Sequence, residues 1–452
     1  MAGSALLKQQ VARHYPTVTH GEGVFLYDAD GRRYLDGSSG AMTASIGHGV
    51  EEIADATRAQ LARVAFSYRT QFTNQPAEDL ARRLTGLAPG DLNWVFFVNS
   101  GSEATEFAMR AAIGYWRERG LPAKVKILSR YMSYHGMTLG ALSMSGHEAR
   151  RPDYGPLLHP FPVGPPAYPF RFALPGEGED AYAARAAGEF EAALVAADPC
   201  TVAAIIVEPI VGAAGGVLMP PNGYLKHLRE ACDRHDVLLI MDEVITGIGR
   251  IGDWFASATE GVVPDLLAVG KGLSAGYFPV AAVLLRAHLV EAMERGSGLA
   301  PFGHTFSGNP AGAATCLAVL DFLVRNEVLE NVRQRGGQLE AGLRHLATKF
   351  PFMADVRGRG LLWGFEFVVD AATREAPAAR HNAAGVFVDE CFERGLIVYP
   401  AGIAPLNNAV MLAPPLTITA GEVGLLLDLL EGALEAMSEH TFMTPPAPAI
   451  TR

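Results

Sequence analysis

Six short apolar segments, most of them separated by stretches long enough for a helix, constrain the fold of this chain more than any other feature. They lie at residues 94–98, 125–128, 202–207, 237–241, 266–269 and 280–285. Strands that are apolar along their whole length are buried on both faces, and their alternation with helices is typical of a parallel sheet covered by helices. Ligands bind such sheets at the carboxyl ends of the strands. We therefore expect an α/β fold with its functional side chains just after these segments.

The rest of the 452-residue chain predicts a second, smaller domain. Two short strand patterns surround the Asp-Ala-Asp-Gly turn near residue 30. Helical and strand patterns follow one another after residue 325. We expect a large α/β domain over 61–325 and a smaller α+β domain made from 1–60 and 326–452. Six prolines within 160–178 predict a loop without regular structure, and the proline-rich C-terminal tail is expected to be loose.

Composition argues against several classes of partner. The net charge is −11, and the absence of a basic cluster argues against nucleic acid and anionic membranes. The four cysteines show no C-x-x-C spacing, which predicts reduced thiols and no metal site. The N-terminus lacks a signal-peptide pattern, and no apolar run reaches the length of a membrane span. We expect a soluble, cytoplasmic protein.

A lysine and a carboxylate stand at the ends of two of the apolar segments. Lys271 lies between two glycines, just after the segment 266–269. Desolvation there lowers the pKa of the amine and prepares it to form a Schiff base. Asp242 and Glu243 end the preceding segment, and only one of them should point into the site because side chains alternate along a strand. We assign Asp242 to hold a pyridinium proton, which predicts pyridoxal phosphate (PLP) as cofactor; the alternative is a pair of salt bridges with Arg250.

The segment Asn99-Ser-Gly-Ser-Glu-Ala104 opens a stretch with helical periodicity. Small residues at the start of a helix expose N–H groups to an anion, and the helix dipole helps to bind it. Ser100, Gly101 and Ser102 are therefore candidates for binding the phosphate of the cofactor. The alternative is ordinary helix capping with Ser102 as the N-cap.

Three further polar positions carry weaker signals. Tyr134, followed by His135, could stack on a cofactor ring, although a tyrosine in a turn is often simply packed. Glu208 follows the segment 202–207 and could belong to the site, cap a helix or pair with an arginine. Thr305, which precedes a predicted helix at 311–323, could donate to phosphate or act as an N-cap.

In this order, these segments resemble the class III aminotransferases of the PLP-dependent fold type I group, from about residue 15 to 435. The combination of Asp242-Glu-Val-Ile-Thr-Gly-Ile-Gly-Arg250 with Lys271-Gly at this spacing is the most specific motif. Supporting motifs are Thr19-His-Gly-Glu-Gly, Gly31-Arg-Arg-Tyr-Leu-Asp36, Phe72-Thr-Asn, Tyr134-His-Gly, Glu208-Pro, His304-Thr-Phe-Ser-Gly and Ala413-Pro-Pro-Leu. The resemblance implies a large domain with a mostly parallel sheet flanked by helices, and a smaller α+β domain.

The resemblance also implies roles for individual residues. Lys271 would form the internal aldimine with PLP and then act as the base for the 1,3-proton shift, while Asp242 holds the pyridinium. Tyr134 would cover one face of the ring and Val244 the other. Thr305 would reach the phosphate across a dimer interface, which implies a homodimer with shared active sites. The predicted cofactor-binding residues are Ser100, Gly101, Ser102, Tyr134, His135, Glu208, Asp242, Val244, Lys271 and Thr305.

One departure from the family bears on the substrate. Many members have an arginine shortly before the Pro-Pro-Leu segment that binds a substrate carboxylate, but here no arginine lies between Arg394 and Arg452. This absence favours an amine donor over a dicarboxylic amino acid. The acceptor carboxylate would have to be met by Arg69 or Arg171, or without a side-chain charge. The predicted substrate-binding residues are Met42, Tyr68, Arg69 and Phe302.

The leading functional hypothesis is an aminotransferase that moves an amino group from a primary amine or ω-amino compound to an α-keto acid such as pyruvate. An amino-acid or lactam racemase or epimerase, which the same family contains, would use the same lysine and cofactor. A catalytically inactive binding protein on this fold is a remote third alternative.

Overall fold

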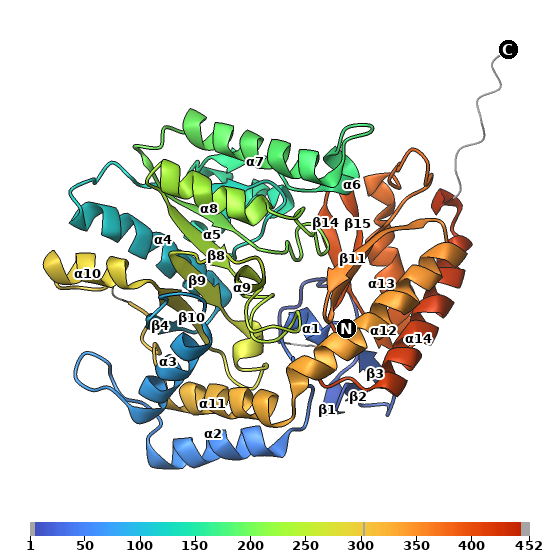
Figure 1. Cartoon of the computed structure of the whole chain (residues 1–452). Helices are drawn as coiled ribbons and strands as arrows, with labels where there is room; N and C mark the ends of the chain where they lie inside the picture. The colour runs from blue at the N-terminus through green and yellow to red at the C-terminus, as the bar shows by residue number, and fades with distance from the viewer. Residues whose placement is uncertain (1–4, 302, 444–452) are drawn as a thin grey trace.

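A seven-stranded sheet forms the centre of the larger part of the molecule (Figure 1). The computed structural model describes residues 5–301 and 303–443. The strand order is β4-β10-β9-β8-β7-β5-β6, and β10 alone runs against the others. The strands are β4 (Trp94–Val98), β5 (Lys126–Arg130), β6 (Val163–Gly164), β7 (Val202–Val207), β8 (Leu238–Asp242), β9 (Leu266–Val269) and β10 (Ala281–Leu285). The six apolar segments are therefore confirmed as strands of a mostly parallel sheet.

Helices cover both faces of this sheet, and the alternation of side chains along its strands shows which helix covers which face. Ile206 and Ile240 pack against α4 (Gly101–Glu118) and α10 (Ala287–Arg295). Their neighbours Ile205 and Leu239 point the other way and pack against α7 (Glu179–Ala196) and α8 (Tyr224–Arg234). Burial on both faces explains why β7 contains no polar position and why β8 has none before Asp242 at its carboxyl end.

Two four-stranded sheets lie outside the large one. The first, β1-β2-β3-β13, joins three N-terminal strands to one from the C-terminal part of the chain, and the second has the order β11-β12-β15-β14. These strands are β1 (Val18–Glu22), β2 (Phe25–Asp28), β3 (Arg33–Asp36), β11 (Met353–Arg359), β12 (Leu362–Phe367), β13 (Leu396–Ile397), β14 (Tyr399–Ile403) and β15 (Leu406–Leu412). Helices α12 (Val328–Lys349), α13 (Ala383–Glu393) and α14 (Ala420–Ser438) flank them on the right of Figure 1. The exact domain limits at residues 60 and 325 stay a prediction.

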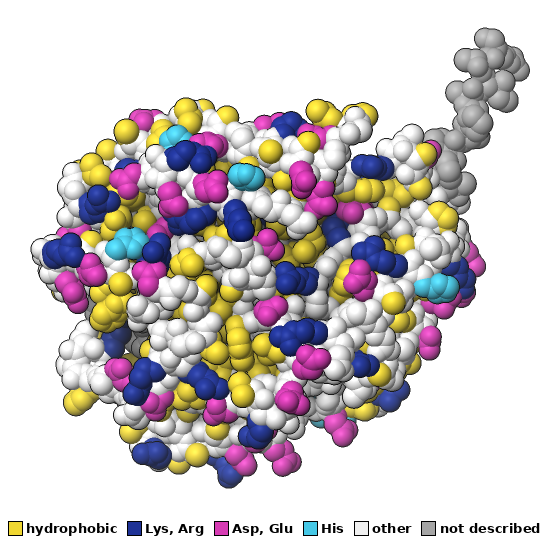
Figure 2. Space-filling view, viewed as in Figure 1, with side chains coloured by type: hydrophobic (Ala, Val, Ile, Leu, Met, Phe, Trp, Pro, Cys, Tyr) yellow, Lys and Arg dark blue, Asp and Glu magenta, His cyan; other side chains and the backbone are white. Residues whose placement is uncertain are grey.

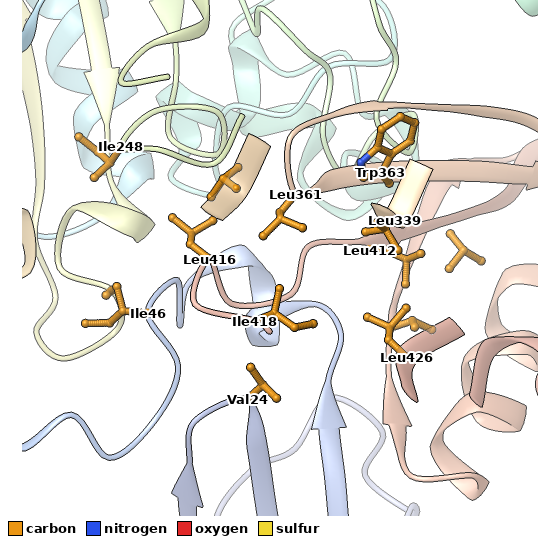
Figure 3. Close-up of a cluster of buried hydrophobic side chains, with 14 of the residues drawn as sticks. Val24, Ile46, Ile248, Leu339, Leu361, Trp363, Leu412, Leu416, Ile418 and Leu426 are labelled. Carbon is orange, nitrogen blue, oxygen red and sulfur yellow. The ribbon is translucent and has the colours of Figure 1, made fainter. Parts of the chain in front are cut away.

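A continuous apolar core connects the small sheets to the loop after β8. Val24 from the turn between β1 and β2, Leu339 from α12 and Leu416 lie with Ile248 in one cluster (Figure 3). Residues from both ends of the chain thus pack against the segment that follows Asp242. This packing fixes the position of the end of β8 relative to the smaller sheets.

The remaining elements surround these sheets. They are α1 (Ser39–Met42, kinked), α2 (Glu51–Arg63), α3 (Gln75–Leu87), α5 (Leu139–Met144), α6 (Pro169–Phe172), α9 (Ala256–Thr259) and α11 (Pro310–Arg325). Short 3-10 helices are η1 (Glu148–Arg150), η2 (Pro152–Leu157), η3 (Lys271–Leu273), η4 (Ala379–His381) and η5 (Thr441–Met443). In the part of the chain that is described, no helix combines the length and apolarity needed to cross a membrane.

The prediction that 160–178 contains no regular structure is wrong, because the segment includes β6 and α6. Both elements are compatible with the prolines. Pro169 stands at the first position of α6, where a helix needs no N–H donor. β6 has two residues and lies at the edge of the sheet, next to β5.

Charged side chains of both signs are interspersed over the face seen in Figure 2, with no broad region of a single sign. This distribution agrees with the acidic but mixed composition of the chain. On this face, no extended basic surface is available for a polyanion.

Candidate active site

A cavity of about 160 Å³ lies where β7, β8 and β9 end and α4 begins. Its lining consists of Gly101, Ser102, Tyr134, His135, Gly136, Glu208, Ile210, Asp242, Val244, Ile245 and Lys271. The structure thus brings together eight of the ten predicted cofactor-binding residues. The two exceptions are Ser100 and Thr305, while Gly136, Ile210 and Ile245 line the cavity without having been predicted.

Lys271 is the first residue of η3, directly after β9 and Gly270. Its backbone φ of 41° lies in the left-handed region, which residues other than glycine rarely adopt. Burial disfavours the ammonium and lowers the pKa of Lys271 to about 8, although the nearby carboxylates of Asp242 and Glu208 act in the opposite direction. More of this amine is therefore neutral near neutral pH than in an ordinary lysine, as a nucleophile requires.

Asp242 forms a buried pair with His135. The distance from His135 Nδ1 to Asp242 Oδ2 is 2.8 Å, and the backbone N–H of Val244 donates to Oδ1 at 3.1 Å. His135 is fully buried, and its Nε2 has no hydrogen-bond partner among the described residues. The carboxylate is thus held in one orientation at the cavity wall by its neighbours.

The adjacent acid, Glu243, points away from the cavity and closes the start of α9. It accepts hydrogen bonds from the N–H groups of Ala256 and Ser257 at 2.6 and 2.8 Å, and from the hydroxyls of Ser257 and Thr246 at 2.6 and 2.9 Å. The alternative of salt bridges with Arg250 is wrong for both acids. The Arg250 guanidinium instead donates to carbonyl oxygens that follow β11 and β15.

Helix α4 begins at Gly101, and its N-cap is Ser100, whose hydroxyl accepts from the N–H of Glu103 at 3.2 Å. The alternative with Ser102 as the N-cap is therefore wrong. First-turn N–H groups of a helix have no acceptor within the helix, so those of Gly101 and Ser102 are available to an anion. The hydroxyl of Ser102 itself accepts from the N–H of Met137 at 3.0 Å.

Two glycines keep this end of the cavity open. A Cβ at Gly101 would lie 3.0 Å from Val244 Cγ1, which leaves no room between α4 and Val244. A Cβ at Gly136 would lie 2.7 Å from Ser102 Cα, and Gly136 also has a φ of 130° that side chains rarely allow. The glycine at position 136 was quoted in the Tyr134-His-Gly motif, but sequence reasoning assigned it no role.

Glu208 and Tyr134 are joined through the backbone. The carboxylate of Glu208 accepts from the N–H of Tyr134 at 2.9 Å and from the N–H of Gly212 at 2.8 Å. Burial raises the pKa of Glu208. The half-buried ring of Tyr134 meets the ring of His147 edge-on, with centroids 6.2 Å apart, and the guanidinium carbon of Arg150 lies 4.6 Å from its centroid.

The predicted substrate residues are dispersed. Met42 is buried and packs in one cluster with Ile210 and Ile245 of the cavity wall. Tyr68 is exposed. Phe302 lies outside the described residues.

Two arginines that could have met a carboxylate are engaged elsewhere. Arg69 lies against the ring of Phe96 and donates to the carbonyl of Gly303 at 2.7 Å, outside the cavity of this chain. Arg171 forms a 2.6 Å ion pair with Glu366. Neither guanidinium lines the cavity.

Thr305 is exposed on the surface of the chain, and it does not cap the following helix. The N-cap of α11 is Asn309, whose side chain accepts from the N–H groups of Ala311 and Gly312. The alternative interpretation of Thr305 as an N-cap is therefore wrong.

This set of groups fits PLP. The amine of Lys271 suits the aldehyde carbon, the carboxylate of Asp242 suits the pyridine nitrogen, and the N–H groups at the start of α4 suit the phosphate. Val244 and Tyr134 both line the cavity and offer flat or apolar surfaces to a ring. The buried, unpartnered Nε2 of His135 leaves one polar atom for a ligand to satisfy.

Comparisons with known proteins identify the family of this chain. A model of the aminotransferase class-III family matches residues 7–434. The chain is 41% identical over 440 residues to the uncharacterized aminotransferase YodT of Bacillus subtilis (strain 168), covering 97% of this chain and 99% of that protein. An (S)-enantioselective omega-transaminase from Thermomicrobium roseum superposes with a TM-score of 0.90 at 35% identity, over 95% of this chain and 94% of the other.

A second solved structure bears on the cofactor. An amine transaminase from an uncultivated Pseudomonas species, in its PLP-bound form, has a TM-score of 0.89 at 33% identity, over 96% of this chain and 98% of the other. The chain described here belongs to the class III aminotransferases, and it is a PLP-dependent enzyme with the fold type I architecture.

Proposed function

We propose that this enzyme transfers the amino group of a primary amine or ω-amino compound to an α-keto acid such as pyruvate. The observation that carries the proposal is one cavity in which Lys271 and Asp242 face a wall made partly of Ile210, Ile245 and Val244. Such a wall favours a donor with an apolar substituent over a dicarboxylic amino acid. The omega-transaminase and amine transaminase among the similar structures support the same substrate class.

Lys271 holds the cofactor and then moves protons. Its lowered pKa leaves the amine neutral often enough to attack a carbonyl carbon and to accept a proton. When bound, PLP takes up the amino group of the donor, passes it to the acceptor and withdraws electrons from the reacting carbon. The amine is anchored at the end of β9 by a short helical turn, so its reach is restricted to the cavity.

Asp242 keeps a proton on the pyridine nitrogen of the cofactor. Its charge is held in place by His135 and by the N–H of Val244. Gly101 and Ser102 bind the phosphate through the start of α4, with Ser100 closing that helix end. Tyr134 and Val244 enclose the ring from opposite sides.

We include in the proposal a homodimer in which Thr305 completes the phosphate site of the partner subunit. Thr305 is exposed in the single chain, next to Phe306, which packs edge-on against Phe66 with ring centroids 5.9 Å apart. Phe66, Phe72 and Phe306 are 43%, 67% and 59% exposed. Apolar surface of this kind is typical of an interface between subunits. Sedimentation velocity of the wild-type enzyme and of Phe306→Glu tests the dimer.

The experiment for the reaction is direct. Purified PLP-loaded enzyme is incubated with a primary amine and pyruvate, and alanine is measured by mass spectrometry, with Lys271→Ala as the control. A parallel reaction contains a single enantiomer of an amino acid and no acceptor, and chiral chromatography follows its optical purity. Alanine formed only by the wild type supports transamination. Racemisation without alanine formation would replace the proposal by the racemase alternative.

A further inference from the structure

A keto-acid acceptor brings a carboxylate to a cavity that already contains two. Asp242 and Glu208 both line the cavity, and their charges repel a further anion. Among the described lining residues, the only cation is Lys271, which the cofactor requires. A productive site for pyruvate therefore needs a positive charge close to the cavity but not in its innermost lining.

Arg150 supplies such a charge. It ends η1, its side chain is half-buried, and its guanidinium carbon lies 4.6 Å from the ring centroid of Tyr134. The Tyr134 ring is part of the cavity wall. Burial is the largest cause that lowers the pKa of Lys271, and the charge of Arg150 also lowers it. The electrostatic field of Arg150 therefore reaches the reacting amine.

The guanidinium of Arg150 differs in its contacts from that of the adjacent Arg151. Arg151 donates to the carbonyl oxygens of Leu142, Ser143 and Ser145 at 3.1, 3.3 and 2.7 Å and closes the end of α5. By contrast, no carboxylate within the described ranges forms an ion pair with Arg150. The cation therefore faces a ring and carries no balancing charge.

We propose that Arg150 binds the carboxylate of the α-keto acid acceptor and thereby sets the specificity of the second half-reaction. A guanidinium that lies over an aromatic face still has N–H groups with which to make a two-point contact with a carboxylate. The inference rests on the proposed transamination and names the residue that recognises its acceptor.

The test compares Arg150→Met with Arg150→Lys in the PLP-loaded enzyme. The two half-reactions are measured separately by stopped-flow absorbance, using a carboxylate-free primary amine as donor and either pyruvate or propanal as acceptor. We expect Arg150→Met to lower kcat/KM for pyruvate about tenfold to a hundredfold, because a charge-assisted pair is lost. The amine half-reaction and the reaction with propanal should stay within about twofold of wild type, and Arg150→Lys should recover part of the loss.

Controls separate the proposal from its rivals. Arg58→Met removes an arginine whose side chain is 81% exposed on α2, and it should change neither acceptor. Unchanged kinetics with pyruvate in Arg150→Met, or equal losses with pyruvate and propanal, would overturn the proposal. A pyruvate-selective loss in Arg69→Ala alone would assign the role to Arg69. Absence of amine turnover in the wild type would instead overturn the proposed function itself.

Discussion

Two adjacent acids at the end of β8 should give opposite results when each loses its charge. Asp242 faces the cavity, whereas Glu243 faces the start of α9. Asp242→Asn should therefore lower the reaction rate with little effect on stability. Glu243→Gln should lower stability with a smaller effect on the rate of the folded enzyme.

The size of the Glu243 effect follows from its hydrogen bonds. Each carboxylate oxygen of Glu243 accepts two hydrogen bonds. In each pair, one donor is a hydroxyl and the other is a backbone N–H from the first turn of α9. Glutamine replaces one oxygen by an NH₂ group, which cannot accept either bond. A buried donor left without a partner costs about 1–3 kcal/mol. Because Glu243→Gln leaves two donors without an acceptor, we expect the free energy of unfolding to fall by about 2–4 kcal/mol.

The Asp242 effect is kinetic. The remaining oxygen of asparagine can accept from the N–H of Val244, and its NH₂ group can donate to Nδ1 of His135 in the other tautomer, so the free energy of unfolding should change by less than about 1 kcal/mol. An amide carries no negative charge to hold the pyridinium proton of bound PLP. Loss of one preorganised charge in a buried site typically costs about 3–4 kcal/mol of transition-state stabilisation, or about a hundredfold to a thousandfold in kcat.

Both variants are assayed in the same way. Urea unfolding of the apoenzyme is followed by circular dichroism, and steady-state turnover of the PLP-loaded enzyme is measured with the best amine and pyruvate. Near-normal turnover in Asp242→Asn would remove that residue from the chemistry. A rate loss with unchanged stability in Glu243→Gln would move the role to Glu243 and refute the assignment of the two faces.

Three further predictions follow from the cavity. Lys271→Ala should abolish turnover while keeping the circular dichroism of the wild type, and borohydride reduction of native enzyme should leave the cofactor mass on the Lys271 peptide and on no other lysine peptide. In the apoenzyme, the reactivity of Lys271 toward trinitrobenzenesulfonate should rise with a midpoint near pH 8, because the neutral amine reacts and the pKa of Lys271 in the folded protein is about 8. The midpoint for an ordinary lysine is about pH 10.4. Peptide mapping that gives Lys271 a midpoint near this ordinary value would contradict the burial argument. Gly136→Ala should weaken PLP binding at least tenfold in a fluorescence titration, because its Cβ would lie 2.7 Å from Ser102 Cα, while Gly114→Ala on α4, with open space around its Cβ, should bind PLP normally.

The central sheet could be predicted from the sequence because its strands are buried on both faces. Apolar runs such as 202–207 contain no polar interruption, so their limits are also the limits of β7. The same physical rule places polar residues at the strand ends, which is why Asp242 and Lys271 could be identified as neighbours. No comparable signal marked β14, which contains Pro400 and Gly402. As an edge strand it tolerates both, and its pairing with β15 depends on the rest of the sheet.

Helix starts were less accessible to sequence reasoning. Ser100 and Ser102 both have side chains suited to an N-cap, and the sequence does not say which hydroxyl meets a backbone N–H. The structure selects Ser100. That choice depends on where β4 ends and on the glycine contact between Gly101 and Val244, both of which are tertiary features. Likewise, the position of Arg69 on Phe96 follows from the packing of distant segments.

Arg150 illustrates what the pattern of residues alone could not provide. It follows Tyr134 by sixteen residues, and the chain between them forms α5 and returns. The return is fixed by a parallel bridge between Tyr131 and Gly146, where a Cβ on the glycine would lie 2.9 Å from Tyr131 Cα. Only because position 146 is a glycine can the returning chain lie against Tyr131 and carry Arg150 back over the Tyr134 ring. In our proposal, recognition of the acceptor carboxylate thus depends on this backbone contact. A search for an arginine near the usual C-terminal position could not have identified Arg150.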